Sequence, residues 1–270
     1  QLLMGQRKGK KMGDSKLVDS MIHDGLWDVY NNMHMGNTGE VVARECSIDR
    51  GQADAFSVQS HLKAAKAWDE GWFDWETFAL EIPQRRGDPV LLERDEGIRA
   101  DSSVEHLSTL RTVFDKDGIV TAGNASTLND GASAVLVTSE EFAKEQGWEI
   151  IATIEDYCTA GVEPERVMSA PIPAVKNLLE RNNLDVLDVD VYEHNEAFAS
   201  ASCAVAQEVG IPHDRFNLHG GAVSLGHPLG SSGTRCLITM LGVMRRLEAE
   251  SGIVTLCLGG GNAVAMYLRR

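Results

Sequence analysis

Three segments in the second half of the chain carry residues that could do chemistry: a histidine in a glycine-rich loop, an Asn-Glu pair, and a cysteine beside three glycines. The histidine, His227, lies between Gly226 and Pro228 in a stretch of small residues, 217–234. Such a stretch forms a loop whose backbone can approach a ligand closely. A helical pattern follows, so polar groups here can meet the free N–H groups of a helix N-terminus. A single Gly-His-Pro sequence is nevertheless more often a packed turn around a core histidine.

Asn195 and Glu196 form the second segment. They follow a predicted strand, residues 186–192, and precede an alanine-rich predicted helix, residues 197–211. Between two core elements an unpartnered polar side chain costs about 1–3 kcal/mol, so both residues need partners. Asn195 could cap the helix, or its amide could hold a water molecule or a ligand carbonyl.

Cys257 belongs to the third segment, at the end of a predicted strand, residues 253–258. Glycines 259–261 and a second apolar strand, residues 263–268, follow it, which predicts a hairpin. An isolated buried cysteine is usually inert. The glycine N–H groups, however, have no side chains that block access, so they could face a developing oxyanion.

The elements that must position these segments alternate strand and helix, as expected of a layered α/β domain. The other predicted elements of the second half are a buried strand at 132–138, a helix at 139–146 capped by Ser139, a strand at 149–157, and helices at 173–181 and 231–246. In the first half the longest predicted helix starts after Ser47 or Asp49, with Gln52 three residues after Asp49 as in a capping box, and ends at Gly71. Thr38 is the predicted cap of a shorter helix that ends at Glu45. Residues 72–100 predict short strands and loops.

The motifs occur in the order Asn-Glu-Ala-Phe (195–198), Gly-His-Pro (226–228) and Cys-Leu-Gly-Gly-Gly (257–261). Together with Gly-Asn-Ala-Ser at 123–126 and His-Met-Gly at 34–36, they resemble the thiolase family, the acetyl-CoA acetyltransferases, over essentially the whole chain. The resemblance implies an α/β, thiolase-like layered αβαβα fold. It also implies reversible Claisen chemistry on 3-ketoacyl-CoA, with coenzyme A or acetyl-CoA as substrate and no permanently bound cofactor or metal.

The resemblance gives individual residues expected roles. Cys257 resembles the acid/base cysteine that moves a proton at the α-carbon and at the thiol. His227 resembles the histidine that activates the nucleophile, and Asn195 the residue that fixes a water in the first oxyanion hole. The N–H of Gly259 would serve a second oxyanion hole, and His34 favours short-chain substrates. Positions that match the CoA-binding residues are Met35, Ala122, Ser126, Ala197 and Phe198 along the pantetheine, and Arg99 near the adenosine phosphate.

The chain departs from the family pattern because the first cysteine, the nucleophile that becomes acylated in a Cys-x-Ser-Gly-like turn, is missing. The cysteines other than Cys257 do not lie in such a turn; they are Cys46, Cys158, Cys203 and Cys236. The resemblance therefore implies that an N-terminal thiolase half, in a longer chain or a separate polypeptide, supplies the nucleophile. The alternative is a non-catalytic CoA-binding or scaffolding subunit. A ketoacyl synthase on the same fold is disfavoured by Asn195 and Cys257.

The resemblance also implies a division into three parts. These are a loop domain (1–125), the last strand and helix of the N-terminal thiolase half (126–149), and the C-terminal domain (150–270). The strand at 132–138 would belong to a sheet whose other strands this chain lacks, so its apolar side chains would be exposed and prone to aggregation. The complete unit is expected to be a homodimer or tetramer.

Composition narrows the function classes further. A formal charge of −15, from 25 basic and 40 acidic residues, argues against nucleic-acid binding, which needs a basic face. The odd number of cysteines and the absence of Cys-x-x-Cys predict neither a disulfide framework nor a zinc site, and favour a reducing compartment such as the cytoplasm. No apolar run is long enough to predict a membrane span. The start at Gln1 leaves an organellar targeting segment open.

Overall fold

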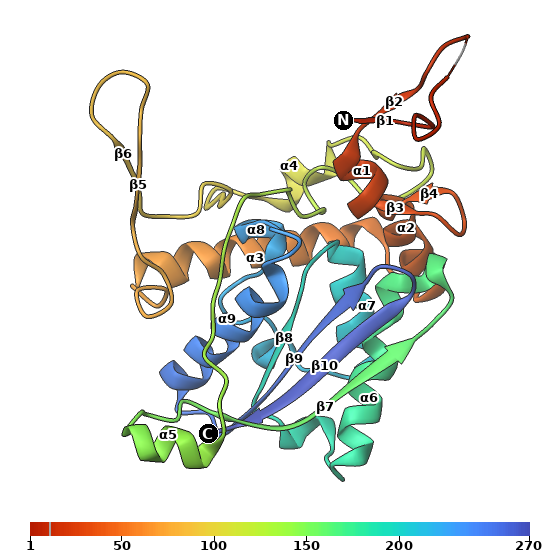
Figure 1. Ribbon diagram of the computed structural model, residues 1–270. Helices are drawn as coiled ribbons and strands as arrows, with labels where there is room; N and C mark the ends of the chain where they lie inside the picture. The colour runs from red at the N-terminus through yellow and green to blue at the C-terminus, as the bar shows by residue number, and fades with distance from the viewer. Residues whose placement is uncertain (11) are drawn as a thin grey trace.

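The computed structural model describes residues 1–10 and 12–270, and a four-stranded sheet of order β7-β10-β9-β8 lies at its centre (Figure 1). The strands are β7 (Thr153–Gly161), β8 (Val191–His194), β9 (Ser251–Leu258) and β10 (Asn262–Arg269). β9 runs parallel to β8 and antiparallel to β10, which pairs antiparallel with β7. The predicted hairpin around glycines 259–261 is therefore confirmed.

Two predicted strands differ from the structure in their limits. β7 begins at Thr153 rather than at residue 149. β8 begins at Val191 because the residues before it form a 3-10 turn, η2 (Val186–Asp188). In that turn the N–H of Asp185 donates to Oδ2 of Asp188 at 2.7 Å. Such local bonds from a side chain to the backbone compete with strand pairing.

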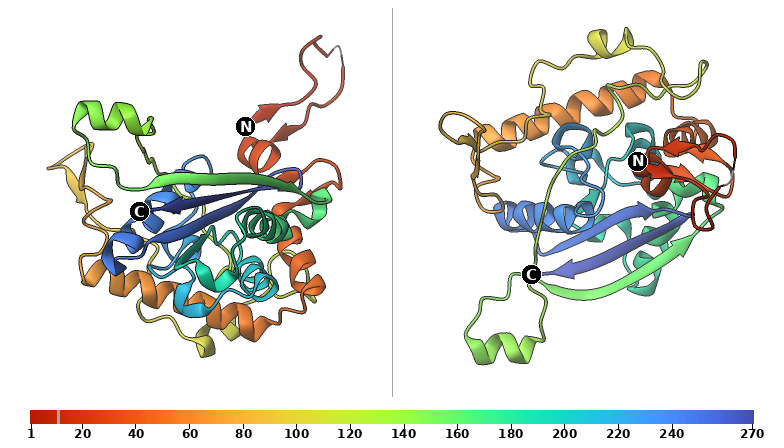
Figure 2. Two further views of the ribbon diagram at one scale, coloured as in Figure 1. Left: turned by 90° about the horizontal axis from the view of Figure 1, so that it is seen from below. Right: turned by 45° about the horizontal axis from the view of Figure 1, so that its top comes forward.

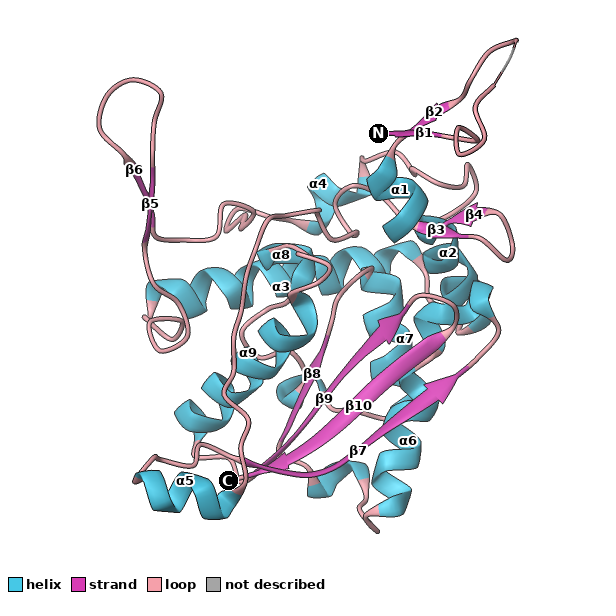
Figure 3. Ribbon diagram, viewed as in Figure 1, coloured by secondary structure: helices cyan, strands magenta, loops and turns pink. Residues whose placement is uncertain are grey.

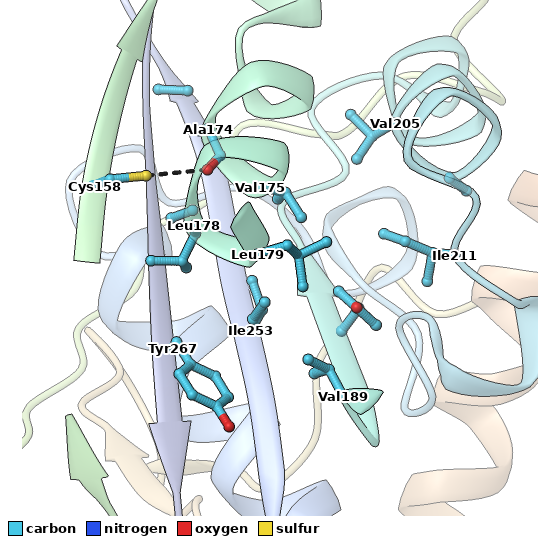
Figure 4. Packing of buried hydrophobic residues seen from close by; sticks show 14 of the residues in the cluster. Cys158, Ala174, Val175, Leu178, Leu179, Val189, Val205, Ile211, Ile253 and Tyr267 are labelled. Atoms are coloured by element: carbon cyan, nitrogen blue, oxygen red, sulfur yellow. Dashed lines mark hydrogen bonds between the residues drawn. The ribbon is translucent and has the colours of Figure 1, made fainter. Parts of the chain in front are cut away.

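Helices cover both faces of the sheet, so the inner part of β8 and β9 is buried, whereas the edge strand β7 is largely exposed. One face carries α6 (Pro171–Arg181) and α7 (Ala199–Val209), and the other carries α9 (Ser232–Leu247). Successive strand residues point to opposite faces, so Ile253 packs on the α6 side and Val254 on the α9 side. Figure 4 shows the α6-side cluster, where the Cys158 thiol donates to the Ala174 carbonyl at 3.0 Å.

An outer layer covers α7. It consists of α3 (Arg50–Asp69) and the short α8 (Ala222–Leu225). The predicted capping box of α3 is confirmed, because the N–H of Gln52 donates to Asp49 Oδ1 and the N–H of Asp49 donates to Gln52 Oε1, both at 2.8 Å. The glycine-rich loop lies directly against α3 at Gly220. This residue has φ 79°, and a Cβ there would lie 2.6 Å from the carbonyl oxygen of Ser60.

The prediction that Thr38 caps a helix is wrong. α2 (Met35–Glu45) begins before Thr38, and its N-cap is His34, whose Nδ1 accepts the N–H of Gly36 at 3.0 Å. Thr38 lies in the first turn, where its Oγ1 donates to the carbonyl of Met35 at 2.6 Å. A histidine ring nitrogen can accept a capping bond as an Asp or Ser oxygen does, but cap preferences do not include it.

The buried strand predicted at residues 132–138 is also wrong. These residues form no strand, and Leu136 and Val137 expose 75% and 66% of their surface. The segment runs along the outside of the molecule without a neighbouring strand (Figure 2), and an apolar run becomes a sheet strand only by pairing. The helix that follows, α5 (Glu140–Gln146), is as predicted, with Ser139 as its N-cap.

Short elements and loops make up most of the remaining chain (Figure 3). They are β1 (Leu2–Leu3), β2 (Leu17–Val18), α1 (Ser20–Gly25), β3 (Trp27–Asp28), β4 (Met33–His34), β5 (Leu80–Ile82), β6 (Val90–Leu92), α4 (Val104–Ser108), η1 (Pro164–Ser169) and η3 (His213–Arg215). β5 and β6 confirm the short strands predicted within residues 72–100, and their hairpin projects from the body (Figure 1). Across the described residues, no helix combines the length and apolar character needed to cross a membrane.

Candidate active site

Asn195 and His227 meet, although 32 residues separate them in the sequence: Nδ2 of Asn195 lies 3.4 Å from Nε2 of His227. Asn195 directly follows β8, and its backbone N–H donates to the carbonyl of Thr255 on β9 at 3.2 Å. The His227 N–H donates to the carbonyl of Thr127 at 2.9 Å. Asn195 does not cap α7, whose N-cap is Phe198, so its buried amide is directed at the histidine instead.

Ser232, at the start of α9, determines the tautomer of His227. Its Oγ lies 2.6 Å from Nδ1 and donates to the carbonyl of Pro228 at 3.0 Å. A hydroxyl has one proton to donate, so it must accept from Nδ1–H, and Nε2 keeps its lone pair. Burial, and secondly the charge of Arg235, lower the pKa of His227 to about 4. At neutral pH the imidazole is therefore uncharged, with a proton-accepting nitrogen facing Asn195.

Cys257 lies near the end of β9, beside the strand that carries Asn195. His194 pairs with Thr255 in these parallel strands, so the C-terminal ends of β8 and β9 lie at the same end of the sheet. Cys257 lies two residues beyond Thr255, at that end. Its Sγ contacts the sulfur of Met168 at 3.8 Å. Burial raises the pKa of Cys257 to about 11, so the thiol keeps its proton at neutral pH. Within the part of the chain that the structure describes, no hydrogen bond joins Cys257 to Asn195 or His227.

The turn after β9 leaves Gly259 open, because a Cβ added there would meet nothing within 4 Å. Gly261 is different: it has φ 86°, and its carbonyl accepts the N–H of Val162 at 2.8 Å. Gly261 therefore shapes the turn, whereas Gly259 presents its backbone to open space.

Four of the expected CoA-binding residues lie together. The N–H of Ser126 donates to the carbonyl of Ala197 at 3.0 Å. Ala125, the residue before Ser126, forms an isolated β-bridge with Phe198. Met35, Ala197, Phe198 and Cys257 belong to one apolar cluster. Met35, Ser126, Ala197 and Phe198 thus lie in the same part of the fold as Cys257.

The other three expected residues occupy different settings. The ring of His34 caps α2 and stacks on Phe114 with centroids 4.8 Å apart, so its Nδ1 is already engaged. Ala122 is exposed. Arg99 is exposed as well, and its position is set by its backbone N–H, which donates to Nδ1 of His61 at 3.1 Å.

Glu196 has the partners that its position demanded. Fully buried, it accepts from Ser60 Oγ at 2.7 Å, from Asn217 Nδ2 at 2.9 Å and from the N–H of Val223 at 3.1 Å. These bonds attach the loop before His227 to α3. Sequence reasoning missed Asn217, although a left-handed residue (φ 45°) at the head of a glycine-rich stretch is a position that favours asparagine.

Sequence reasoning also missed Ser232, because a serine in the first turn of a helix usually serves the helix itself. In the residues that the structure describes, no three His, Cys, Asp or Glu side chains are grouped so that they could hold a metal ion. The side chains and N–H groups gathered at this site can transfer protons and stabilise an oxyanion.

Comparisons with known proteins agree with this geometry. The models of the thiolase N-terminal and C-terminal domains match residues 2–141 and 148–270. The chain is 48% identical over 269 residues to an acetyl-CoA acetyltransferase of Cupriavidus necator and 47% identical to a probable acetyl-CoA acyltransferase of Staphylococcus aureus, covering 100% of this chain and 68% of each relative.

Solved structures show the same likeness in three dimensions. A Bacillus anthracis acetyl-CoA acetyltransferase has a TM-score of 0.95 at 37% identity, and human mitochondrial 3-ketoacyl-CoA thiolase has 0.94 at 34% identity. Each match covers 99% of this chain and 68% of the other. The predicted α/β, thiolase-like fold is confirmed. With both domain models matched in order and relatives nearly half identical across its length, this chain belongs to the thiolase family of acyltransferases.

Proposed function

We propose that this chain forms the acid/base part of a thiolase active site that acts on short-chain 3-ketoacyl-CoA, in reversible Claisen condensation and thiolytic cleavage. The observation that carries the proposal is the contact of Asn195 with His227, whose Nε2 keeps its lone pair. Cys257 lies at the same sheet edge. The names of the relatives, acetyl-CoA acetyltransferase and acyltransferase, support this reaction class.

His227 and Cys257 have the protonation states that the cleavage direction requires, and Asn195 contributes a neutral amide. Neutral His227 accepts the proton of an attacking thiol at Nε2. Cys257, as a thiol, donates a proton to the carbanion that C–C cleavage leaves beside a thioester, and as a thiolate it removes that proton in the reverse direction. The N–H of Gly259 and a water held by Asn195 stabilise the oxyanions, and one such donor contributes roughly 10²–10³-fold in kcat.

The expected CoA-binding residues complete the proposal. The pantetheine arm passes the cluster around Phe198, with Arg99 toward the adenosine phosphate. The residues assigned to this path are His34, Met35, Ala122, Ser126, Ala197 and Phe198. Thr38 follows His34 in the first turn of α2, and the ring of Phe114 stacks on His34 in the fold. The stacked ring favours a narrow, short-chain site.

The nucleophile must come from residues outside this chain. Of the cysteines other than Cys257, Cys236 lies closest to the site, with its Sγ 4.0 Å from Oδ1 of Asn195. It is fully buried, and burial raises its pKa to about 12, so neither its location nor its protonation state suits attack on a thioester. We assign the nucleophile to a cysteine in an N-terminal thiolase half, in the same or a separate polypeptide.

Exposed apolar side chains support such a partner. Leu136 and Val137 are exposed, and so are Trp148, Ile151 and Tyr157 farther along the chain. Contiguous exposed apolar surface marks an interaction site. We propose that strands of the N-terminal half pair with residues 132–138, so that the loop domain (1–125), the segment 126–149 and the C-terminal domain (150–270) join one unit, which then assembles into a homodimer or tetramer.

Acetoacetyl-CoA thiolysis tests the proposed function. The chain is isolated with any polypeptide that accompanies it, and is also combined with the N-terminal half of a thiolase. Acetoacetyl-CoA and CoA are supplied, and loss of the enolate absorbance is followed. Turnover that is abolished in His227→Gln and in Cys257→Ala, with slower turnover of longer 3-ketoacyl-CoA, supports the proposal. A combined preparation that binds CoA without turnover would instead identify a scaffolding subunit.

A further inference from the structure

A buried ion pair lies directly behind the contact between Asn195 and His227. Nη1 of Arg235 lies 3.3 Å from Oε1 of Glu193, and the carboxylate is fully buried. Glu193 precedes Asn195 by two residues on the same face of β8. Arg235 follows Ser232 by three residues, so both lie on one side of α9. The loop and helix that hold His227 are therefore linked to the strand that holds Asn195 twice, once by the site contact and once by the ion pair.

Burying the Glu193–Arg235 ion pair in the protein core costs desolvation free energy. Burial raises the pKa of Glu193, an effect that the charge of Arg235 opposes. Oε2 of Glu193 and Nε of Arg235 have no hydrogen-bond partner among the described residues. A buried pair with such unsatisfied atoms gains little stability over apolar residues of similar size. Its location one helical turn from the site suggests a role other than stability.

The surroundings of Arg235 connect it to both site residues. Its Nη2 lies 2.8 Å from Sγ of Cys236, whose sulfur is 4.0 Å from Oδ1 of Asn195. The acidic groups around the guanidinium are Glu193 on β8, Glu196 after it, Glu76 in the loop after α3, and Asp95 in the loop after β6. On the His227 side, the neighbouring side chains of Asn195 and Ser232 are uncharged.

We propose that Arg235, held by Glu193, is a positioning residue for the Asn195–His227 pair. Its charge disfavours an imidazolium at His227, and its bonds fix α9 relative to β8 so that Nε2 faces the amide. The effect of Arg235 in lowering the pKa of His227 agrees with this role. The inference rests on the proposed use of His227 as a base.

Carbethoxylation of His227 by diethyl pyrocarbonate tests the proposal without turnover, because the reagent modifies only unprotonated imidazole. The full chain, with any polypeptide that accompanies it, is modified between about pH 5.5 and pH 8, and modification is localised by tandem mass spectrometry. The variants are Arg235→Met and Arg235→Lys. Arg245→Met is the matched control, because Arg245 is exposed on the same helix.

In the wild type and in Arg245→Met, the rate at His227 should stay flat down to about pH 5.5, because the pKa lies well below the ordinary value of about 6.5. Arg235→Met should raise the pKa of His227 toward its ordinary value and so lower the rate at the acid end relative to Arg245→Met, since burial is then the only effect that opposes the imidazolium. Arg235→Lys, which keeps the charge, should retain the wild-type profile. Identical profiles for Arg235→Met and Arg245→Met would overturn the proposal.

A double variant keeps the test valid where Arg235→Met does not fold. Glu193→Leu with Arg235→Met removes both buried charges and leaves no unpaired carboxylate. In this double variant the rate of His227 modification should also fall at the acid end. If the ion pair had only a structural role, the dependence of that rate on pH would not change. If Arg235→Met changes the pH profile of His227 modification as expected but the preparation shows no thiolysis, the result counts against the proposed function. It does not count against the positioning role of Arg235.

Discussion

His227 acts through two contacts on opposite sides of its ring. Asn195 lies at Nε2 and Ser232 at Nδ1, and the serine determines which nitrogen carries the proton. The residues proposed to react are named from the resemblance to thiolases, which is carried by short, local motifs. Ser232 and Arg235 cannot be named in this way, since their importance depends on how a helix lies against a strand. Such tertiary pairing leaves no local pattern.

Replacing Ser232 by alanine tests the tautomer argument. The Nδ1–H would lose its acceptor, so the two tautomers would become closer in free energy and Nε2 would carry a proton more often. Thiolysis by the completed enzyme should fall roughly 10²-fold in kcat, within the range of a general base, with a smaller change in KM. Ser231→Ala is the control, because Ser231 Oγ bonds to Ser133 at 2.6 Å instead. Equal losses in the two variants would refute the assignment.

Cys257 should behave as a thiol of unusually high pKa. Because only the thiolate is alkylated, a pKa of about 11 in place of 9.0 lowers its rate with iodoacetamide about 100-fold at pH 8. The rate should continue to rise about tenfold per pH unit up to pH 10. The control is the same cysteine in the urea-unfolded chain, whose rate should level off near its ordinary pKa. Matching pH profiles in the folded and unfolded states would contradict the effect of burial.

At the scale of elements, the sequence predicted helices and the central hairpin well and the remaining strands less well. α3 and α5 follow from their caps, and α6, α7 and α9 follow from alanine-rich or periodic apolar sequence; these are local signals. β8 was predicted too long because side-chain bonds of Asp185 and Asp188 replace strand pairing. The cap of α2 was misplaced because His34 supplies the acceptor. In each case a specific hydrogen bond overrode a propensity.

The capping box of α3 provides a prediction at this scale. Asp49→Ala removes the acceptor for the N–H of Gln52 and should lower the free energy of unfolding by about 1 kcal/mol. Urea denaturation followed by circular dichroism measures the change. Asp69→Ala at the other end of the helix is the control, because its pair with Arg94 is exposed and contributes little. A loss in Asp69→Ala as large as that in Asp49→Ala would show that the cap is not the cause.

At the scale of the whole molecule, the distribution of apolar side chains is uneven. The sheet core is closed on both faces by α6, α7 and α9, whereas residues 132–157 carry large apolar side chains in the open. The apolar content of residues 132–138 predicts a buried strand, which is wrong because no strand among the described residues pairs with this segment. The exposure of its apolar side chains is expected only from the resemblance to thiolases, because composition alone does not show which strands are present to pair with it.

Serine substitution in this segment tests whether it is an unfilled interface. We expect the chain on its own to self-associate through Leu136 and Val137, which expose 75% and 66% of their surface. Leu136→Ser with Val137→Ser should shift sedimentation toward the monomer with little change in the free energy of unfolding. Leu187→Ser, at an equally exposed leucine elsewhere, should leave self-association intact. The same double variant should weaken binding of a thiolase N-terminal half, because its apolar contacts and strand pairing would be lost. A wild-type chain that sediments as a stable monomer and ignores that half would exclude an interface here.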